Sequence, residues 1–162
     1  YLQSVEVKDQ TGDYERNLPW YRWEADIDQN TLSKMTAENT KKNIGTVQSL
    51  EVTKSGPGGA ALQIKVSGDR GTVVVDTENK IRRALGGSGY EIKKQDGTAV
   101  KGSRLLPSAF FKVEKEGNIF KIKGGGYGHG IGMSQNGANE MAKKGKNYQQ
   151  ILQMFYPGTT IE

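Results

Sequence analysis

Residues 124–135 contain six glycines in their first nine positions, a density that neither a helix nor a regular strand accommodates well. Because glycine lacks a Cβ, such a backbone can adopt positive φ angles and allow a ligand to approach the main chain closely. The one histidine of the chain, His129, lies here between Gly128 and Gly130. We call residues 124–135 the glycine segment and predict a loop between a preceding strand and a following helix.

The rest of the composition indicates a polar chain with many turns. Glycine makes up 22 of 162 residues without a period and proline only four, so neither a collagen-like repeat nor a disordered tract fits. The net charge of +5 comes from interspersed charges, which argues against a nucleic-acid partner and leaves a mixed surface or an anionic polymer. With no cysteine and no run of about 18 apolar residues, neither disulfides nor a membrane span is expected in the chain.

Apolar alternation and turn signals predict an α+β fold, a mainly antiparallel sheet with several short helices, two of them C-terminal. Strands are expected at residues 1–7, 20–27, 47–53, 61–66, 72–76, 109–114 and 118–123, the last two as a hairpin. Helices are expected up to residue 41 after Asp28, and at 78–85, 136–144 and 147–155, with Thr77 and Asn147 as further N-caps. Residues 87–104 are polar and turn-rich, which predicts a surface excursion.

Several kinds of site are open to the glycine segment. A dinucleotide-binding loop needs glycines at positions one, three and six of a parallel βαβ unit, but Met133 stands where spacing from Gly128 requires the last glycine. A serine hydrolase built from Ser134 and His129 lacks a nearby aspartate, and one histidine without cysteine is a poor zinc ligand set. From the residues alone, a structural turn and a functional loop are equal alternatives.

A pattern of fixed spacing continues from the glycine segment towards the end of the chain. It covers residues 126–138, then Met141, Ala142, Gly145, Tyr148, Ile151, Leu152 and residues 155–159. This pattern closely resembles the C-terminal signature of the SpoIID/LytB family. Weaker, collinear agreement upstream involves Tyr1, Leu2, Trp23, Ile44, Gly45, Ile81, Arg82 and residues 106–110. The resemblance therefore covers most of the chain and is specific from residue 124 onward.

The resemblance implies an extracytoplasmic protein, in the cell wall or at the outer face of the membrane, that acts on peptidoglycan glycan strands. Sporulation members of the family resemble lytic transglycosylases, in which one acid protonates the glycosidic oxygen and then acts as a base. Other members are named as enhancers of an N-acetylmuramoyl-L-alanine amidase. The alternative is therefore a non-catalytic wall-binding module whose partner is that amidase. Neither interpretation calls for a cofactor or a metal.

The essential glutamate of the family lies in a stretch that nothing in this chain matches. We therefore assign no catalytic residue and expect the acid upstream of Tyr1. Glu140 is the carboxylate nearest to the glycine segment in sequence, but it is expected to face solvent from a helix and is not assigned. We expect residues 1–162 to form a single domain, truncated at its N-terminus, that supplies the substrate-binding half of the cleft.

The candidate substrate-binding residues come from the glycine segment and from two upstream positions. They are Tyr127, Gly128, His129, Gly130, Ser134, Gln135, Arg82 and Ser108. Tyr127 is expected either to stack on a sugar ring or to pack within the protein. Arg82 is a candidate for binding a muramyl carboxylate, with a surface ion pair as its alternative, and Ser108 has turn capping as its alternative.

Overall fold

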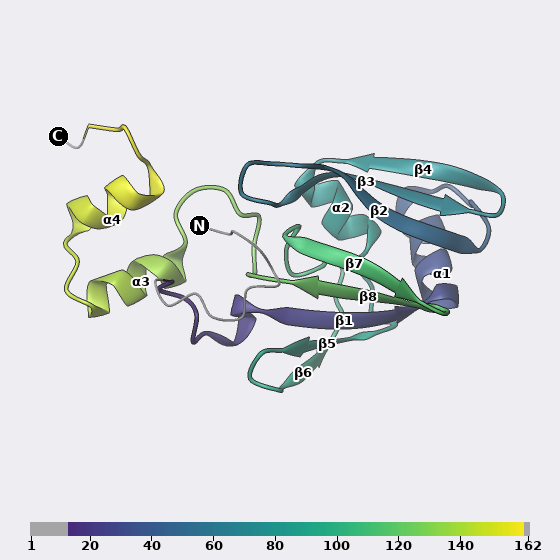
Figure 1. Ribbon diagram of the computed structural model, residues 1–162, viewed down its shortest axis with the longest axis horizontal. Helices are drawn as coiled ribbons and strands as arrows, with labels where there is room; N and C mark the ends of the chain where they lie inside the picture. The colour runs from purple at the N-terminus through teal and green to yellow at the C-terminus, as the bar shows by residue number, and fades with distance from the viewer. Residues whose placement is uncertain (1–12, 161–162) are drawn as a thin grey trace.

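The computed structural model describes residues 13–160, so the strand predicted at residues 1–7 lies outside the described part. The fold is α+β, as predicted, with two antiparallel sheets (Figure 1). The strands are β1 (Trp23–Asp28), β2 (Val47–Ser55), β3 (Ala61–Gly68), β4 (Gly71–Asp76), β5 (Glu91–Lys94), β6 (Ala99–Lys101), β7 (Phe111–Glu116) and β8 (Ile119–Gly124). The helices are a short 3₁₀ helix η1 (Pro19–Tyr21), α1 (Gln29–Thr40), α2 (Glu78–Ala84), α3 (Gln135–Lys143) and α4 (Tyr148–Phe155).

The larger sheet has the strand order β6-β5-β1-β8-β7, which places β1 at its centre. Trp23, Ala25 and Ile27 alternate with exposed residues along β1 and point into the core. The antiparallel register pairs Trp23 with Gly124, so the start of β1 lies beside the end of β8. This register brings the residues before β1 close to the glycine segment, which leaves β8.

The smaller sheet, with the order β2-β3-β4, packs against α1 and α2 (Figure 1). Its buried residues Ile64 and Val66 join the same hydrophobic cluster as Leu32 of α1, Ile81 of α2 and Phe120 of β8. Burial of each such side chain stabilises the fold by about 1.5–3 kcal/mol. The shared cluster therefore holds the two sheets and two helices together. α3 and α4 lie to one side of both sheets in Figure 1.

Three predicted helix starts have different outcomes in the structure. Asp28 caps α1 by accepting a 2.9 Å hydrogen bond from the backbone N–H of Thr31, as predicted. Asn147 and Gln150 form the reciprocal capping box predicted for α4. Thr77 stands at the N-cap position of α2, but its φ is 75° and its side chain makes no capping hydrogen bond, so its predicted role as a cap is wrong.

Residues 87–104 are mostly exposed, as expected of a surface excursion, but they are not irregular. Residues 91–101 form the hairpin β5–β6, which extends the larger sheet by pairing Trp23 of β1 with Lys94 of β5. The hairpin is fixed by two buried apolar side chains, Tyr90 and Ile92, in an otherwise polar stretch. A second difference is that β1 begins at Trp23 rather than at residue 20, because the 3₁₀ helix with Pro19 at its first position occupies the preceding residues.

Candidate functional site

The glycine segment begins where the larger sheet needs a residue without a Cβ. A Cβ at Gly124 would lie 2.2 Å from Cζ2 of Trp23, whose ring covers this position. The next residue, Gly125, donates its N–H to the carbonyl of Phe110 at 3.0 Å. The first two glycines therefore permit close packing at the end of β8, and the backbone leaves the sheet only after them.

Tyr127 is held by its backbone on both sides while its ring stays in solvent. The N–H of Gly126 donates to the carbonyl of Trp20 at 2.8 Å, and the N–H of Gly128 donates to the carbonyl of Pro107 at 2.9 Å. The indole N–H of Trp23 also donates to the carbonyl of Gly126 at 3.0 Å. The Tyr127 side chain is nevertheless 67% exposed, and its ring centroid lies 4.8 Å from that of Trp20 at an angle of 43°.

His129 lies at the exposed part of the segment, between the exposed Gly130 and the half-buried Gly128. Its Nδ1 accepts a 3.0 Å hydrogen bond from the backbone N–H of Ile131. Because an accepting Nδ1 cannot carry the proton of a neutral imidazole, Nε2 carries it and is a donor. The histidine thus offers one N–H group to a ligand at the surface.

Ser134 is the next-to-last residue of the segment and the N-cap of α3. Its Oγ accepts a 3.1 Å hydrogen bond from the N–H of Gly137 and donates one of 2.5 Å to Oε1 of Glu15. The hydroxyl proton is therefore directed to Glu15 rather than to His129, and the Ser–His pair considered above is not formed. Gln135 follows as the exposed first residue of α3.

Glu15 is a residue that sequence reasoning missed. It belongs to residues 13–18, which precede η1 and pass beside the glycine segment and α3. In the same stretch the ring of Tyr14 lies 4.9 Å from Nζ of Lys144, and the carboxylate of Asp13 accepts a hydrogen bond from the Tyr21 hydroxyl. Burial, followed by this bond to Asp13, raises the pKa of Tyr21 to about 12. No local pattern indicates the Glu15 contact, because its partner Ser134 lies 119 positions later in the chain.

Arg82 and Ser108, predicted as substrate-binding residues, lie inside the fold. Arg82 is 7% exposed; its Nε donates to the carbonyl of Leu106 at 2.8 Å and its guanidinium pairs with Glu78 at 2.5 Å. It is an ion-pair partner, as the alternative prediction had it, but a buried one. The Ser108 hydroxyl donates to the carbonyl of Gly125 at 2.7 Å and accepts from the N–H of Phe110. Neither side chain is available at the surface for a sugar, and Ser108 stabilises the turn before β7.

Glu140 lies on α3, where its side chain is 24% exposed and pairs with Lys143 at 2.6 Å. It is thus less exposed than expected, and its carboxylate is directed along its own helix. Among residues 13–160 no group of three or more histidine, aspartate or glutamate side chains could hold a metal ion. No helix in this part of the chain has the length and apolar character needed to cross a bilayer.

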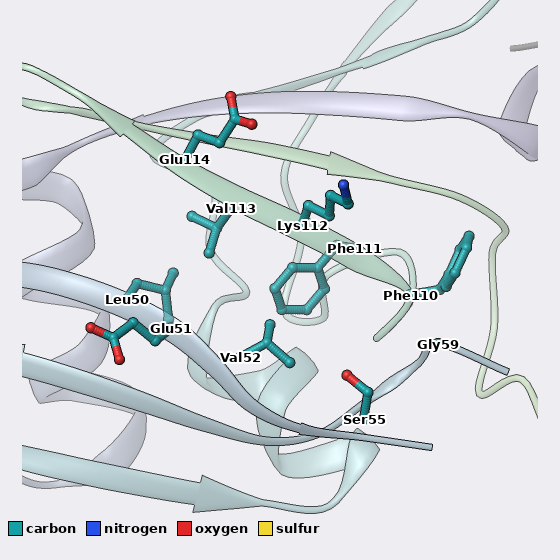
Figure 2. A pocket seen from close by; sticks show the side chains of 10 residues that line it. All are labelled: Leu50, Glu51, Val52, Ser55, Gly59, Phe110, Phe111, Lys112, Val113 and Glu114. Atoms are coloured by element: carbon teal, nitrogen blue, oxygen red, sulfur yellow. The ribbon is translucent and has the colours of Figure 1, made fainter. Parts of the chain in front are cut away.

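A groove of about 510 Å³ lies elsewhere, between the edge strands β2 and β7 (Figure 2). Leu50 and Val52 of β2 face Phe111 and Val113 of β7 across it. Glu51, Lys112 and Glu114 also line the groove, which leaves no single sign of charge there. None of the sequence-predicted site residues lines it, so we place the candidate site at the glycine segment.

A family model described as "Domain of unknown function (DUF8618)" matches residues 3–132. The chain is 47% identical over 60 residues to the amidase enhancer of Bacillus subtilis, which is 37% of the chain and 8% of that protein. It is 41% identical over 71 residues to stage II sporulation protein D of the same organism, which is 41% of the chain and 21% of that protein. For stage II sporulation protein D of Bacillus amyloliquefaciens, the identity is 41% over 69 residues, covering 43% of the chain and 20% of the protein.

Proposed function

We propose that this chain, which belongs to the family described as Domain of unknown function (DUF8618) and is related to the SpoIID/LytB proteins, binds the glycan strands of peptidoglycan. The proposal places the chain outside the cytoplasm, in cell-wall remodelling during sporulation. One observation carries it: the glycine segment presents the exposed Tyr127 and His129 from a backbone that is hydrogen-bonded to η1, to the loop before β7 and to the Trp23 side chain of β1.

The chemistry of this surface suits a sugar chain. A pyranose ring has C–H faces that pack on an aromatic ring, and Tyr127 exposes such a ring. Hydroxyl and N-acetyl groups need donors and acceptors, which Nε2 of His129 and the exposed amide side chain of Gln135 provide. Because the backbone around Tyr127 is already fixed, binding loses little conformational entropy there.

The finer proposal is cleavage of the MurNAc–GlcNAc linkage by a lytic transglycosylase. An acid gives its proton to the glycosidic oxygen as the C1–O bond breaks, and its carboxylate then removes the proton of the muramyl 6-hydroxyl, whose oxygen bonds to C1. We assign that acid to no residue of this chain. Residues 124–135 hold and orient the strand in this scheme, and the chain alone is expected to bind stripped glycan without cutting it.

A second candidate function is favoured by the similarity to the amidase enhancer. In this proposal the same surface binds the wall without any bond cleavage, and the protein increases the rate of a cell-wall amidase. Its partner would then be the amidase as well as the glycan strand. Only this second function predicts that the chain increases the rate of an amidase added to the assay.

Both proposals require that the chain binds glycan. Binding of the purified chain to immobilised glycan strands, stripped of their peptides, tests this requirement. We expect saturable binding, and no 1,6-anhydro-muramyl ends in the strands when they are examined by mass spectrometry. Anhydro ends would show that a residue of this chain acts as the catalytic acid, which we do not expect. Failure to bind the strands would contradict the proposed function itself. In a parallel assay with an amidase and intact wall, a rate increase supports the enhancer function, and an unchanged rate contradicts it.

A further inference from the structure

The groove between β2 and β7 lies where the edges of the two sheets face each other (Figure 2). In the part of the chain that the structure describes, β7 pairs only with β8, and β2 pairs only with β3. The groove is closed at one end, where the N–H of Ala61 donates to the carbonyl of Ala109 at 2.7 Å. An edge strand presents N–H and C=O groups that an extended chain can bind.

Of the two edges, that of β7 is the more regular. Its residues Phe111–Glu116 pair with β8 without a register shift and include no proline. The register of β2 shifts between Val52 and Ser55. Such bulges protect a sheet edge from a further strand. β7 therefore offers an uninterrupted edge of six residues to which another strand can add.

The floor of the groove is apolar and continuous with the core. Leu50 and Phe111 belong to the buried hydrophobic cluster, and Val52 and Val113 pack against it while they stay partly exposed. Successive side chains of a strand point to opposite faces, so a strand added here would place every second side chain on this floor. Because Val52 and Val113 would then lose their contact with water, apolar side chains are favoured at those positions.

Two exposed carboxylates, one from each strand, line the groove without an ionic partner of their own. Among residues 13–160 no salt bridge engages Glu51 of β2 or Glu114 of β7. Lys121 lies opposite Glu114 in the register but pairs with Glu116 at 2.6 Å. Lys112 also lines the groove, so a ligand with one cationic group suits it better than a polycation.

The strands already paired with β7 and β2 show which sequence these edges accept. Residues 120–122 of β8 lie opposite residues 113–115 of β7, and residues 64–66 of β3 lie opposite residues 50–52 of β2. Both partner segments have the pattern apolar–lysine–apolar, and in both the lysine is in register with a glutamate. A strand on the free side of β7 meets the same alternation of apolar and acidic residues.

We propose that the edge of β7 binds an extended peptide segment of a partner protein, with the pattern apolar–lysine–apolar, as an additional strand of the larger sheet. The peptide backbone pairs with β7, its apolar side chains cover Val52 and Val113, and its ammonium group meets the carboxylates of Glu114 and Glu51. The inference goes beyond glycan binding and does not depend on it, because none of the candidate substrate-binding residues lines the groove.

The probe is a fluorescent peptide with the sequence of residues 61–67, blocked at both ends and titrated with the whole chain. We expect saturable binding and slower hydrogen exchange of the β7 amides when the peptide is present. A peptide with glutamate in place of lysine should bind about three- to tenfold more weakly, since attraction becomes repulsion. A peptide methylated on two adjacent backbone nitrogens should not bind, because it cannot continue the ladder.

A pair of chain variants locates the site. E114K should reverse the preference, so that the glutamate peptide binds more tightly than the lysine peptide. E38K makes the same change on α1, at an exposed residue outside the groove, and should leave the preference as it is. Thermal unfolding of both variants is expected at the native midpoint, and both should bind glycan strands as the native chain does.

Several results would overturn the inference. No binding of the lysine peptide, or equal binding of its methylated form, would show that no strand adds to β7. An equal effect of E38K and E114K would mean general charge attraction. Self-association of the native chain that protects the β7 amides without peptide would make a second copy the occupant, which also contradicts the proposal. Each of these results leaves glycan binding intact, and a loss of glycan binding leaves the peptide site intact.

Discussion

The hydroxyl of Ser134 donates a hydrogen bond of 2.5 Å to the carboxylate of Glu15, a residue 119 positions earlier in the chain. A hydroxyl has one proton, so this donation leaves the lone pairs of Ser134 Oγ to accept from the N–H of Gly137. Glu15 therefore fixes the side chain that caps α3. Through this cap Glu15, which precedes β1, also holds the C-terminal end of the glycine segment in place.

Replacement of Ser134 by alanine is expected to remove the cap of α3 and to cost about 1 kcal/mol of helix stability. The amide proton of Gly137 should then exchange faster with deuterium, while the core strands keep their protection. E15A should increase the same exchange rate, and E15Q should do so less, because its amide oxygen still accepts from Ser134. Equal exchange in E15A and the native chain would show that Glu15 does not support the cap.

Replacement of His129 by alanine is expected to weaken glycan binding by about tenfold, the loss of one good hydrogen bond, without changing the unfolding midpoint. The side chain is exposed and bonds only to the N–H of Ile131 among the described residues, so its loss leaves the core intact. Binding to immobilised strands and thermal unfolding measure the two effects. Unchanged affinity would mean that this histidine is part of a structural turn only.

Replacement of Arg82 by methionine is expected to destabilise the protein by about 3 kcal/mol or more, because Glu78 and the carbonyl of Leu106 lose a buried partner. Glycan affinity of the folded protein should not change, since Arg82 lies inside the fold. Urea unfolding gives the stability, and binding is measured below the unfolding transition. A loss of affinity with full stability would restore the role in binding a carboxylate that the sequence suggested.

The hydroxyl of Tyr90 is buried and donates to the carbonyl of Leu85 at 2.7 Å, and burial raises the pKa of this group. Below the ordinary tyrosine pKa of about 10 the group is neutral in both folded and unfolded states, so it adds no pH dependence. Above that pH the unfolded chain ionises first, and the free energy of unfolding should fall. Y90F should lower stability by about 1 kcal/mol near pH 8 but show a smaller fall by pH 11. Parallel alkaline curves for Y90F and the native chain would contradict this cause.

The parts of the fold that the sequence predicted correctly are those set by neighbouring residues. Asp28 and Asn147 bond to amide groups three residues ahead, and a short turn at residues 117–118 joins the adjacent strands β7 and β8 as the predicted hairpin, although its tip was expected at residues 115–117. Such interactions need no knowledge of the rest of the chain. The hairpins of the smaller sheet were predictable for the same reason.

The parts that the sequence did not reveal depend on distant partners. The pairing of β5 with β1 joins Lys94 to Trp23 across the chain, and a polar stretch with two buried apolar residues gives little sign of it. Arg82 looks like a charged residue on a helix surface until the carbonyl of Leu106 is placed against its Nε. The role of Glu15 likewise becomes visible only when its carboxylate is seen to accept the hydrogen bond from Ser134. In each case the tertiary fold determines the role of a polar residue.

The register that pairs Trp23 with Gly124 also limits how a chain of this kind can change in length. Removal of Ile119 from β8, with the turn to β7 unchanged, would turn Phe120 and Ile122 away from the core and shift the start of the glycine segment by about 3.3 Å relative to η1. An insertion in the exposed turn around Gly117 changes neither relationship. Length variation is therefore tolerable at that turn, whereas a single deletion in β8 would disrupt the core and the candidate site together.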